Sequence, residues 1–297
     1  MFLAIGLAPR LGCAALFSST AGTSSPPAPP PRTETRACLG RRRTRSRPLR
    51  PRASGPVVAH PRCALAAAYK SLKKQGKLAD DEHTKFIAFG GDGGTYDIGL
   101  QSLSGAMERG HDLLYVCYDN GAYMNTGIQR SSATPRFADT TTSPAGKVIP
   151  GKMQSRKDLT KIMVGHHLPY VAQSIAVNNM KDLYEKAEKA IYTEGPTFLN
   201  VMAPCPRGWG YQTDELMEIN KLAVETCYWP LYEVVNGVYN ITYKPTKKLP
   251  IEEFLRPQKR FKHMFKEGNE WMIEEFQKEV DKRWQELLDL EELTNKN

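Results

Sequence analysis

The sequence lacks paired cysteines, long apolar runs and evenly distributed charge. No CxxC pair or regular cysteine spacing occurs, which excludes a disulfide framework. No run of 18 apolar residues occurs either, so we expect no membrane-spanning helix and no membrane partner. Residues 1–64 contain eleven arginines, no lysine and one acidic residue, whereas the remainder is close to neutral. The net charge of +9 therefore does not describe the body of the protein, and a basic nucleic-acid groove across it is excluded.

Residues 1–62 differ in composition from the rest of the chain. They contain ten of the 21 prolines, together with the runs SSPPAPPPR and RRRTRSRPLRPR. Because proline blocks helix interiors and little apolar surface is available to bury, we expect a disordered Arg/Pro-rich leader. Its composition leaves three alternatives: a segment foreign to the natural chain, an organellar transit peptide and an arginine-rich nucleic-acid arm. We expect a cytoplasmic protein, with an organelle as the alternative if the segment is a transit peptide.

From residue 63 onward, helical and strand patterns alternate. ALAAAYKSLKKQGKL has helical spacing, KFIAFGG reads as a strand, DIGLQSLSGAMERG as a helix and DLLYVCYDN as a second buried strand. Strand, helix and strand in succession form a βαβ unit, which predicts an α/β fold with a parallel sheet covered by helices. A strand in YVAQSIAV, a helix over 180–192 and a strand in TFLNVMAPC continue the pattern. We expect this domain to span residues 63–225, with a long loop over 121–158.

Residues 226–297 are expected to form a C-terminal extension, irregular at first and then an amphipathic helical arm. Apolar residues recur there at every fourth position, which places them on one face of a helix. This stripe consists of Met272, Phe276, Val280, Trp284 and Leu288. The stripe could pack against its own domain or against a partner subunit, and the sequence leaves both alternatives open.

The segments GGDGGTYDIGLQ and NGAYMNTGIQ carry the chemistry. Gly91, Gly93 and Gly94 follow the first strand and let a ligand approach the backbone closely. A helix starting near Tyr96 would point free amide groups at the same place, which suits a diphosphate. Asp92 and Asn120 stand at the ends of neighbouring parallel strands, where both can offer oxygen atoms to Mg²⁺.

Longer motifs extend this pattern. GGDGGTYDIGLQ, VCYDNGAYMNTGIQRS, TTTSPAGK, APCPRGW and LAVETCYWPLYE resemble the β subunits of pyruvate:ferredoxin oxidoreductases and their 2-oxoacid relatives, over about residues 64–290. The resemblance implies a domain that binds thiamine pyrophosphate (TPP), with Mg²⁺ held by Asp92, Asn120 and the carbonyl of Ala122. It also implies that Asn125 lies beside the thiazolium ring and the substrate carbonyl.

The activity implied by this resemblance is the oxidative decarboxylation of pyruvate to acetyl-CoA and CO₂, with electrons passed to ferredoxin. Coenzyme A would take the acyl group. A partner α subunit would supply the aminopyrimidine site and its activating glutamate. Alternatives are another 2-oxoacid, such as 2-oxoisovalerate or 2-oxoglutarate, and a non-catalytic subunit without an iron–sulfur cluster.

Two departures from the family pattern concern the upstream segment that usually carries cluster cysteines and the residue at Gly121. The resemblance makes Cys205 one of four thiolates of a 4Fe-4S cluster, whose other cysteines usually lie upstream, where this chain has its Arg/Pro-rich segment. We therefore expect a domain truncated on its N-terminal side, and a buried, inert thiol is the alternative for Cys205. Gly121 stands where the family often carries Glu, a change expected to alter the loop without removing a metal ligand.

Overall fold

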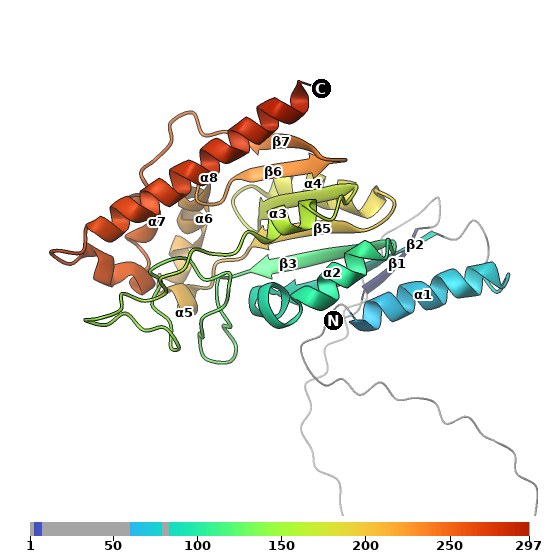
Figure 1. Ribbon diagram of the computed structural model, residues 1–297, viewed down its shortest axis with the longest axis horizontal. Helices are drawn as coiled ribbons and strands as arrows, with labels where there is room; N and C mark the ends of the chain where they lie inside the picture. Colours follow the sequence, from blue (N-terminus) through green and yellow to red (C-terminus); the bar gives the residue numbers. More distant parts are fainter. Residues whose placement is uncertain (1–2, 8–59, 79–82, 297) are drawn as a thin grey trace, which may run out of the picture. The chain divides into compact units, whose positions relative to one another are not determined.

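The computed structural model describes residues 3–7, 60–78 and 83–296, so most of the predicted leader lies outside the described residues. The described residues form a seven-stranded sheet of order β1-β2-β3-β5-β4-β6-β7 (Figure 1). Its strands are β1 (Leu3–Leu7), β2 (His83–Gly91), β3 (Leu113–Asp119), β4 (Tyr170–Ile175), β5 (Thr197–Met202), β6 (Leu231–Val235) and β7 (Val238–Tyr243). The central strands β2, β3, β5 and β4 are parallel, as predicted, whereas β1, β6 and β7 pair antiparallel.

Helices cover both faces of this sheet. They are α1 (His60–Lys74), the π-helical η1 (Gly93–Ile98), α2 (Leu100–Glu108), α3 (Leu159–Val164), α4 (Met180–Tyr192), α5 (Pro206–Trp209), the 3-10 turn η2 (Thr213–Glu215), α6 (Leu216–Glu225), α7 (Ile251–Leu255), the 3-10 segment η3 (Lys259–Phe265) and α8 (Trp271–Asn295). One face packs Leu103 of α2 and Met163 of α3 against strand residues, and α4 packs Ala190 on the opposite face. The α/β class predicted from the sequence is therefore confirmed.

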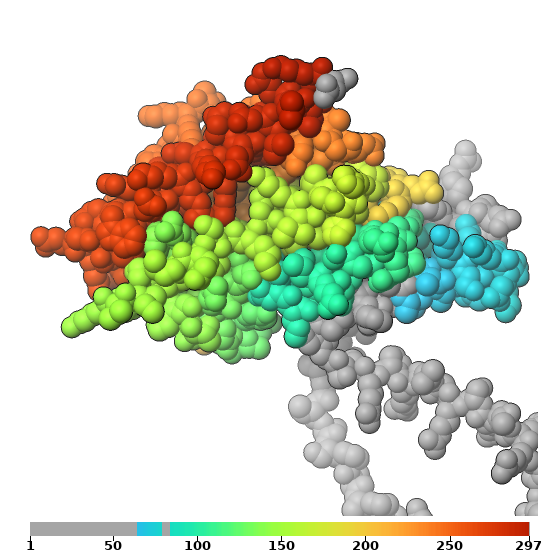
Figure 2. Space-filling view, viewed as in Figure 1, coloured from blue at the N-terminus to red at the C-terminus, as the bar shows by residue number. Residues whose placement is uncertain are grey.

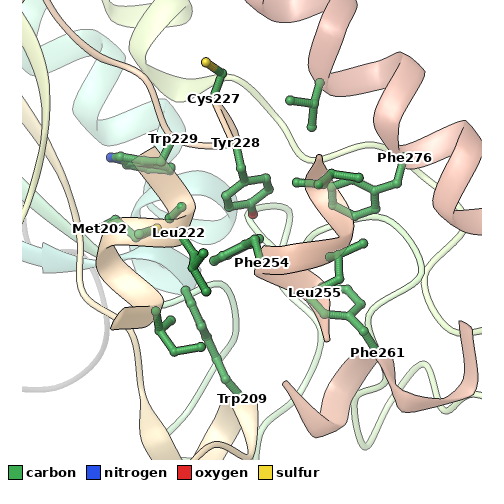
Figure 3. Close-up of a cluster of buried hydrophobic side chains, with 14 of the residues drawn as sticks. Met202, Trp209, Leu222, Cys227, Tyr228, Trp229, Phe254, Leu255, Phe261 and Phe276 are labelled. Atoms are coloured by element: carbon green, nitrogen blue, oxygen red, sulfur yellow. The ribbon is translucent and has the colours of Figure 1, made fainter. Parts of the chain in front are cut away.

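An aromatic core lies beyond the sheet, among α5 to α8. Tyr228 stacks on Phe254 with ring centroids 4.6 Å apart, and Phe276 of α8 lies 6.0 Å from Tyr228 (Figure 3). Met272 and Val280 of the predicted stripe are buried in the same core. The chain itself therefore covers this part of the stripe, which confirms the first of the two alternatives.

The irregular structure predicted after residue 226 is wrong for residues 231–243, which form the β6–β7 hairpin. Asn236 and Gly237 make its turn with φ angles of 49° and 87°. Asn-Gly is the sequence best suited to a two-residue turn with both φ angles positive, because neither residue is strained there. β6 then pairs with β4 and extends the sheet beyond its parallel strands.

Helix α8 lies against the end of the long 121–158 loop, as the red and yellow-green atoms of Figure 2 show. Ser155 donates to Glu279 at 2.8 Å, and Arg283 donates to the backbone oxygen of Arg156 at 3.0 Å. Near this contact Lys161 pairs with Glu286 at 2.8 Å. These contacts hold the loop beside the carboxyl ends of β2 and β3. Among the helices described, none is long and apolar enough to cross a membrane.

Candidate cofactor and metal site

Asp92 follows directly on β2 and is almost completely buried, with 1% of its surface exposed. Its backbone is already helical, and η1 begins at the next residue, Gly93. The helix thus starts three residues before the predicted position near Tyr96. Oδ2 of Asp92 accepts a hydrogen bond from the hydroxyl of Ser131 at 2.6 Å, so Oδ1 is the oxygen turned toward the neighbouring strand end.

Asn120 and Ala122 meet Asp92 at this edge of the sheet. One of the two terminal atoms of the Asn120 side-chain amide, either its oxygen or its nitrogen, lies 2.8 Å from Asp92 Oδ1 and 2.8 Å from the backbone oxygen of Ala122. With its nitrogen in that position, the amide donates to both oxygens. With its oxygen there, three oxygens would converge at about the separation of neighbouring ligands around an octahedral Mg²⁺, roughly 2.9 Å. The structure thus brings together the three predicted metal-binding residues, and their donor atoms fit this ion.

The electrostatics of Asp92 reflect this burial. Burial raises the pKa of Asp92 to about 8, and the nearby Asp119 carboxylate adds to the rise. Hydrogen bonds from Ser131 and Asn120 oppose it. A cation against Oδ1 would favour the ionised carboxylate, since an opposite charge at contact distance stabilises the charged form.

Asp119 anchors the turn that carries Asn120 and Ala122. Its Oδ1 accepts from the backbone N–H of Gly121 at 3.0 Å, and its Oδ2 accepts from Tyr96 at 2.6 Å. Arg156 forms a buried ion pair with the same carboxylate at 2.5 Å. Asp119 and Arg156 escaped the sequence analysis, because the two lie 37 residues apart and only the folded loop brings them together.

The predicted glycines line the start of η1. A Cβ on Gly93 would lie 2.4 Å from the ring of Tyr123, so no larger residue fits there without displacing that ring. Gly91 ends β2, and a Cβ there would touch Tyr118 at 3.3 Å. Gly94 is the second residue of η1, where backbone N–H groups have no partner within the helix.

Asn125 and Cys205 lie outside the group formed by Asp92, Asn120 and Ala122. Asn125 is exposed in the turn where Gly127 donates to the oxygen of Met124 at 3.3 Å. Cys205 follows β5 and is partly exposed, and its Sγ accepts from Gly208 N at 3.4 Å. Cys117 and Cys227 are buried. Within the described ranges, no three His, Cys, Asp or Glu residues form a group that could hold a metal ion.

The fold and these motifs define a TPP-binding enzyme domain. Residues 63–201 match the family described as “Thiamine pyrophosphate enzyme, C-terminal TPP binding domain”. The chain belongs to the β subunits of TPP-dependent 2-oxoacid:ferredoxin oxidoreductases, as its relatives show. It is 51% identical over 238 residues to pyruvate synthase subunit PorB of Thermotoga maritima, covering 80% of this chain and 73% of that protein.

Two further relatives match a comparable share of this chain. Pyruvate synthase subunit PorB of Methanocaldococcus jannaschii is 53% identical over 220 residues, which cover 74% of this chain and 72% of that protein. Ketoisovalerate oxidoreductase subunit VorB of Pyrococcus abyssi is 46% identical over 231 residues, which cover 77% of this chain and 72% of that protein. Relatives named for two different oxoacids thus share most of this chain.

Proposed function

We propose that this chain binds the diphosphate of TPP through Mg²⁺ held by Asp92, Asn120 and the carbonyl oxygen of Ala122. The observation that carries the proposal is the meeting of these three groups, with the Asn120 amide 2.8 Å from each of the other two oxygens. Gly91, Gly93 and Gly94 would accommodate the diphosphate. The backbone N–H groups at the start of η1 suit its negative charge.

The residues around the ligands would hold them in place. Ser131 occupies one oxygen of Asp92, which leaves Oδ1 for the metal. The Asp119–Arg156 pair fixes the turn from which Asn120 and Ala122 project. When bound, TPP supplies the electron sink that the decarboxylation of a 2-oxoacid requires. Asn125, exposed on the adjoining turn, would donate its amide N–H to the substrate carbonyl.

The proposed reaction converts pyruvate, coenzyme A and two oxidised ferredoxins to acetyl-CoA, CO₂, one proton and two reduced ferredoxins. An α subunit would complete the site. Pyruvate is supported by the names of relatives at 51% and 53% identity, and 2-oxoisovalerate is the second candidate because a relative at 46% identity is named for it. Oxoacid-dependent reduction of a viologen dye by the assembled complex, compared between the two acids, distinguishes them.

The iron–sulfur cluster fits this chain less well. A 4Fe-4S cube needs four thiolates, and three free cysteines are described, Cys117, Cys205 and Cys227, of which only Cys205 is partly exposed. Cys117 sits within β3 and Cys227 within the aromatic core. We therefore assign no step to a cluster in this chain. Iron and sulfide analysis of the anaerobically purified subunit tests the point, and four irons per chain would reverse it.

The metal and cofactor site is tested by Asp92→Asn. This change removes the carboxylate charge while keeping the size of the side chain. Because it is the one charged ligand in the proposed set, we expect TPP affinity in the presence of Mg²⁺ to fall at least about tenfold, as for loss of a charged contact. Calorimetry on the complex with its partner subunit measures this affinity. Asp214→Asn, at an exposed position in η2, is the control, and equal affinities for the two variants would refute the assignment.

A further inference from the structure

Arg260 is buried beside the candidate site, with 6% of its surface exposed. Its guanidinium carbon lies 3.8 Å from the ring centroid of Trp209, and Nε donates to Gln258 at 2.8 Å. Nη2 is inaccessible to solvent, and no hydrogen-bond partner for it lies among the described residues. A buried guanidinium with an unmet donor is costly.

The nearest buried carboxylate is already engaged. Asp119 accepts from Arg156 at 2.5 Å and from Tyr96 at 2.6 Å. Arg156 and Arg260 thus place two positive charges near one carboxylate. Burial, and to a lesser degree the charge of Arg156, lower the pKa of Arg260 to about 9. Among the described residues, no carboxylate forms an ion pair with Arg260.

Gly121 explains why no side chain fills the space beside this guanidinium. A Cβ on Gly121 would lie 3.2 Å from Nη1 of Arg260, so a residue with a carboxylate here would project toward the charge. Gly121 has a φ of 73°, a conformation in which glycine is unstrained.

A surface hollow of about 400 Å³ opens against Arg260. Its wall also contains Arg207 and Lys259, and Asp139 is the single acidic residue among those that line it. The hydroxyl-bearing Thr140 and Thr141 complete its polar lining. A hollow with three cationic side chains, one of them buried and under-satisfied, favours a small anionic group.

We propose that this hollow is an anion-binding pocket that takes the phosphate or carboxylate group of an organic anion, with Arg207, Lys259 and Arg260 supplying the positive charge of its wall. Both groups form charge-assisted hydrogen bonds with arginine and lysine side chains. The pocket adjoins the candidate cofactor site, since Trp209 stacks on Arg260 and donates to the backbone oxygen of Asn120 at 2.6 Å. Anion binding is a property separate from the proposed TPP binding and does not depend on it.

The test measures the melting temperature of the full chain against inorganic phosphate and, separately, acetate, in a buffer free of other small anions. All proteins carry Asp92→Asn, so that the proposed diphosphate site is weakened throughout. We expect Arg260→Gln to weaken the response at least about tenfold in anion concentration, as for loss of a charged hydrogen-bonding group. Without added anion, this variant should melt no lower than its parent, because it removes an uncompensated buried charge.

Arg207→Gln keeps the buried arginine and serves as a second variant if Arg260→Gln does not fold. It should weaken the response about threefold, since an exposed charge contributes less. Lys147→Gln, an exposed lysine of the neighbouring loop outside the pocket, is the control and should match the parent. A response to phosphate alone or to acetate alone identifies the group that is bound. No response to either anion, or a full response in Arg260→Gln, would overturn the proposal.

Discussion

Lys152 is a buried lysine held by backbone oxygens. Its side chain is 2% exposed, and Nζ donates to the carbonyls of Ser132 and Thr134. No ion pair to it is found in the part of the chain described. Burial, aided by the positive charges of Arg130 and Arg156, lowers the pKa of Lys152 to about 7. Lys152 therefore fastens the long loop through hydrogen bonds, at the cost of keeping an ammonium group out of water.

This shift makes stability depend on pH in a defined direction. In the unfolded chain the lysine pKa is about 10.4, so between pH 7 and 10 the unfolded state binds more protons and stability rises with pH. This gain in the free energy of unfolding is lost as pH falls toward 7. Lys152→Met should remove this rise, whose slope is at most about 1.4 kcal/mol per pH unit for one group. Urea unfolding at pH 7, 8 and 9 measures the slope, and the exposed Lys147→Met is the control. Identical slopes for wild type and Lys152→Met would contradict the assignment.

At the candidate site, the meeting of Asp92 and Asn120 was predictable, whereas the residues that support them were not. Asp92 and Asn120 end neighbouring strands of a parallel sheet, so chain topology alone brings them to one edge. Ser131 contacts Asp92 from 39 residues away, within a loop that has no periodic pattern to predict its path. The unpartnered guanidinium donor of Arg260 could not be predicted either, because Gly121 and Trp209, which surround it, come from distant segments of the chain.

Among the elements, repeating patterns were predictable and short local signals were overlooked. The helix over 180–192 is found as α4, because its apolar spacing continues for several turns. The β6–β7 hairpin was missed although Asn236-Gly237 marks its turn. β4 and β5, in which every residue is buried, were predictable because their segments are mostly apolar.

Helix α8 both fills the core and closes the sheet edge at β7. Glu291 accepts from the backbone N–H of Ile241 at 2.7 Å, and Thr294 accepts from that of Tyr239 at 3.0 Å. These side chains use donors that an edge strand would otherwise offer to another chain. Nearer its middle, the half-buried Trp284 packs against both the aromatic core and the face covered by α2 and α3. α8 thus contacts both apolar regions, as strands β4, β5 and β6 also do.

Trp284→Asp should therefore unfold the isolated subunit rather than merely detach a partner. The change removes a large aromatic contact and adds a charge, at a cost of roughly 3–5 kcal/mol. Circular dichroism with urea unfolding measures the loss. Gln285→Glu adds the same charge at an exposed neighbouring position and should change stability by less than about 0.5 kcal/mol. A folded Trp284→Asp subunit that only fails to bind its partner would show that the helix is held chiefly by the interface.

Across the whole molecule, the excess positive charge lies in one part of the chain and the remainder is electrically balanced. Residues 1–59 contain ten arginines and one glutamate, a formal +9, which equals the net charge of all 297 residues. Residues 60–297 therefore have equal numbers of acidic and basic residues. Retention by a polyanion reflects the number of basic groups that meet it and weakens steeply with salt. On this basis strands β2 to β7, the candidate cofactor site and the anion pocket all belong to an electrically balanced part of the chain.

A chain that begins at residue 60 should therefore lose polyanion binding. On a heparin column at pH 7 and low salt, we expect the full chain to be retained and to elute as salt rises, because ten arginines can displace counterions. The shortened chain should pass through unretained. The shortened chain also lacks β1, so its circular dichroism spectrum checks that the remaining helices and strands still form, and Asp92→Asn in the full chain should leave retention unchanged. If the shortened chain were held as tightly as the full chain, the basic surface would have to lie on the body, in conflict with its balanced charge.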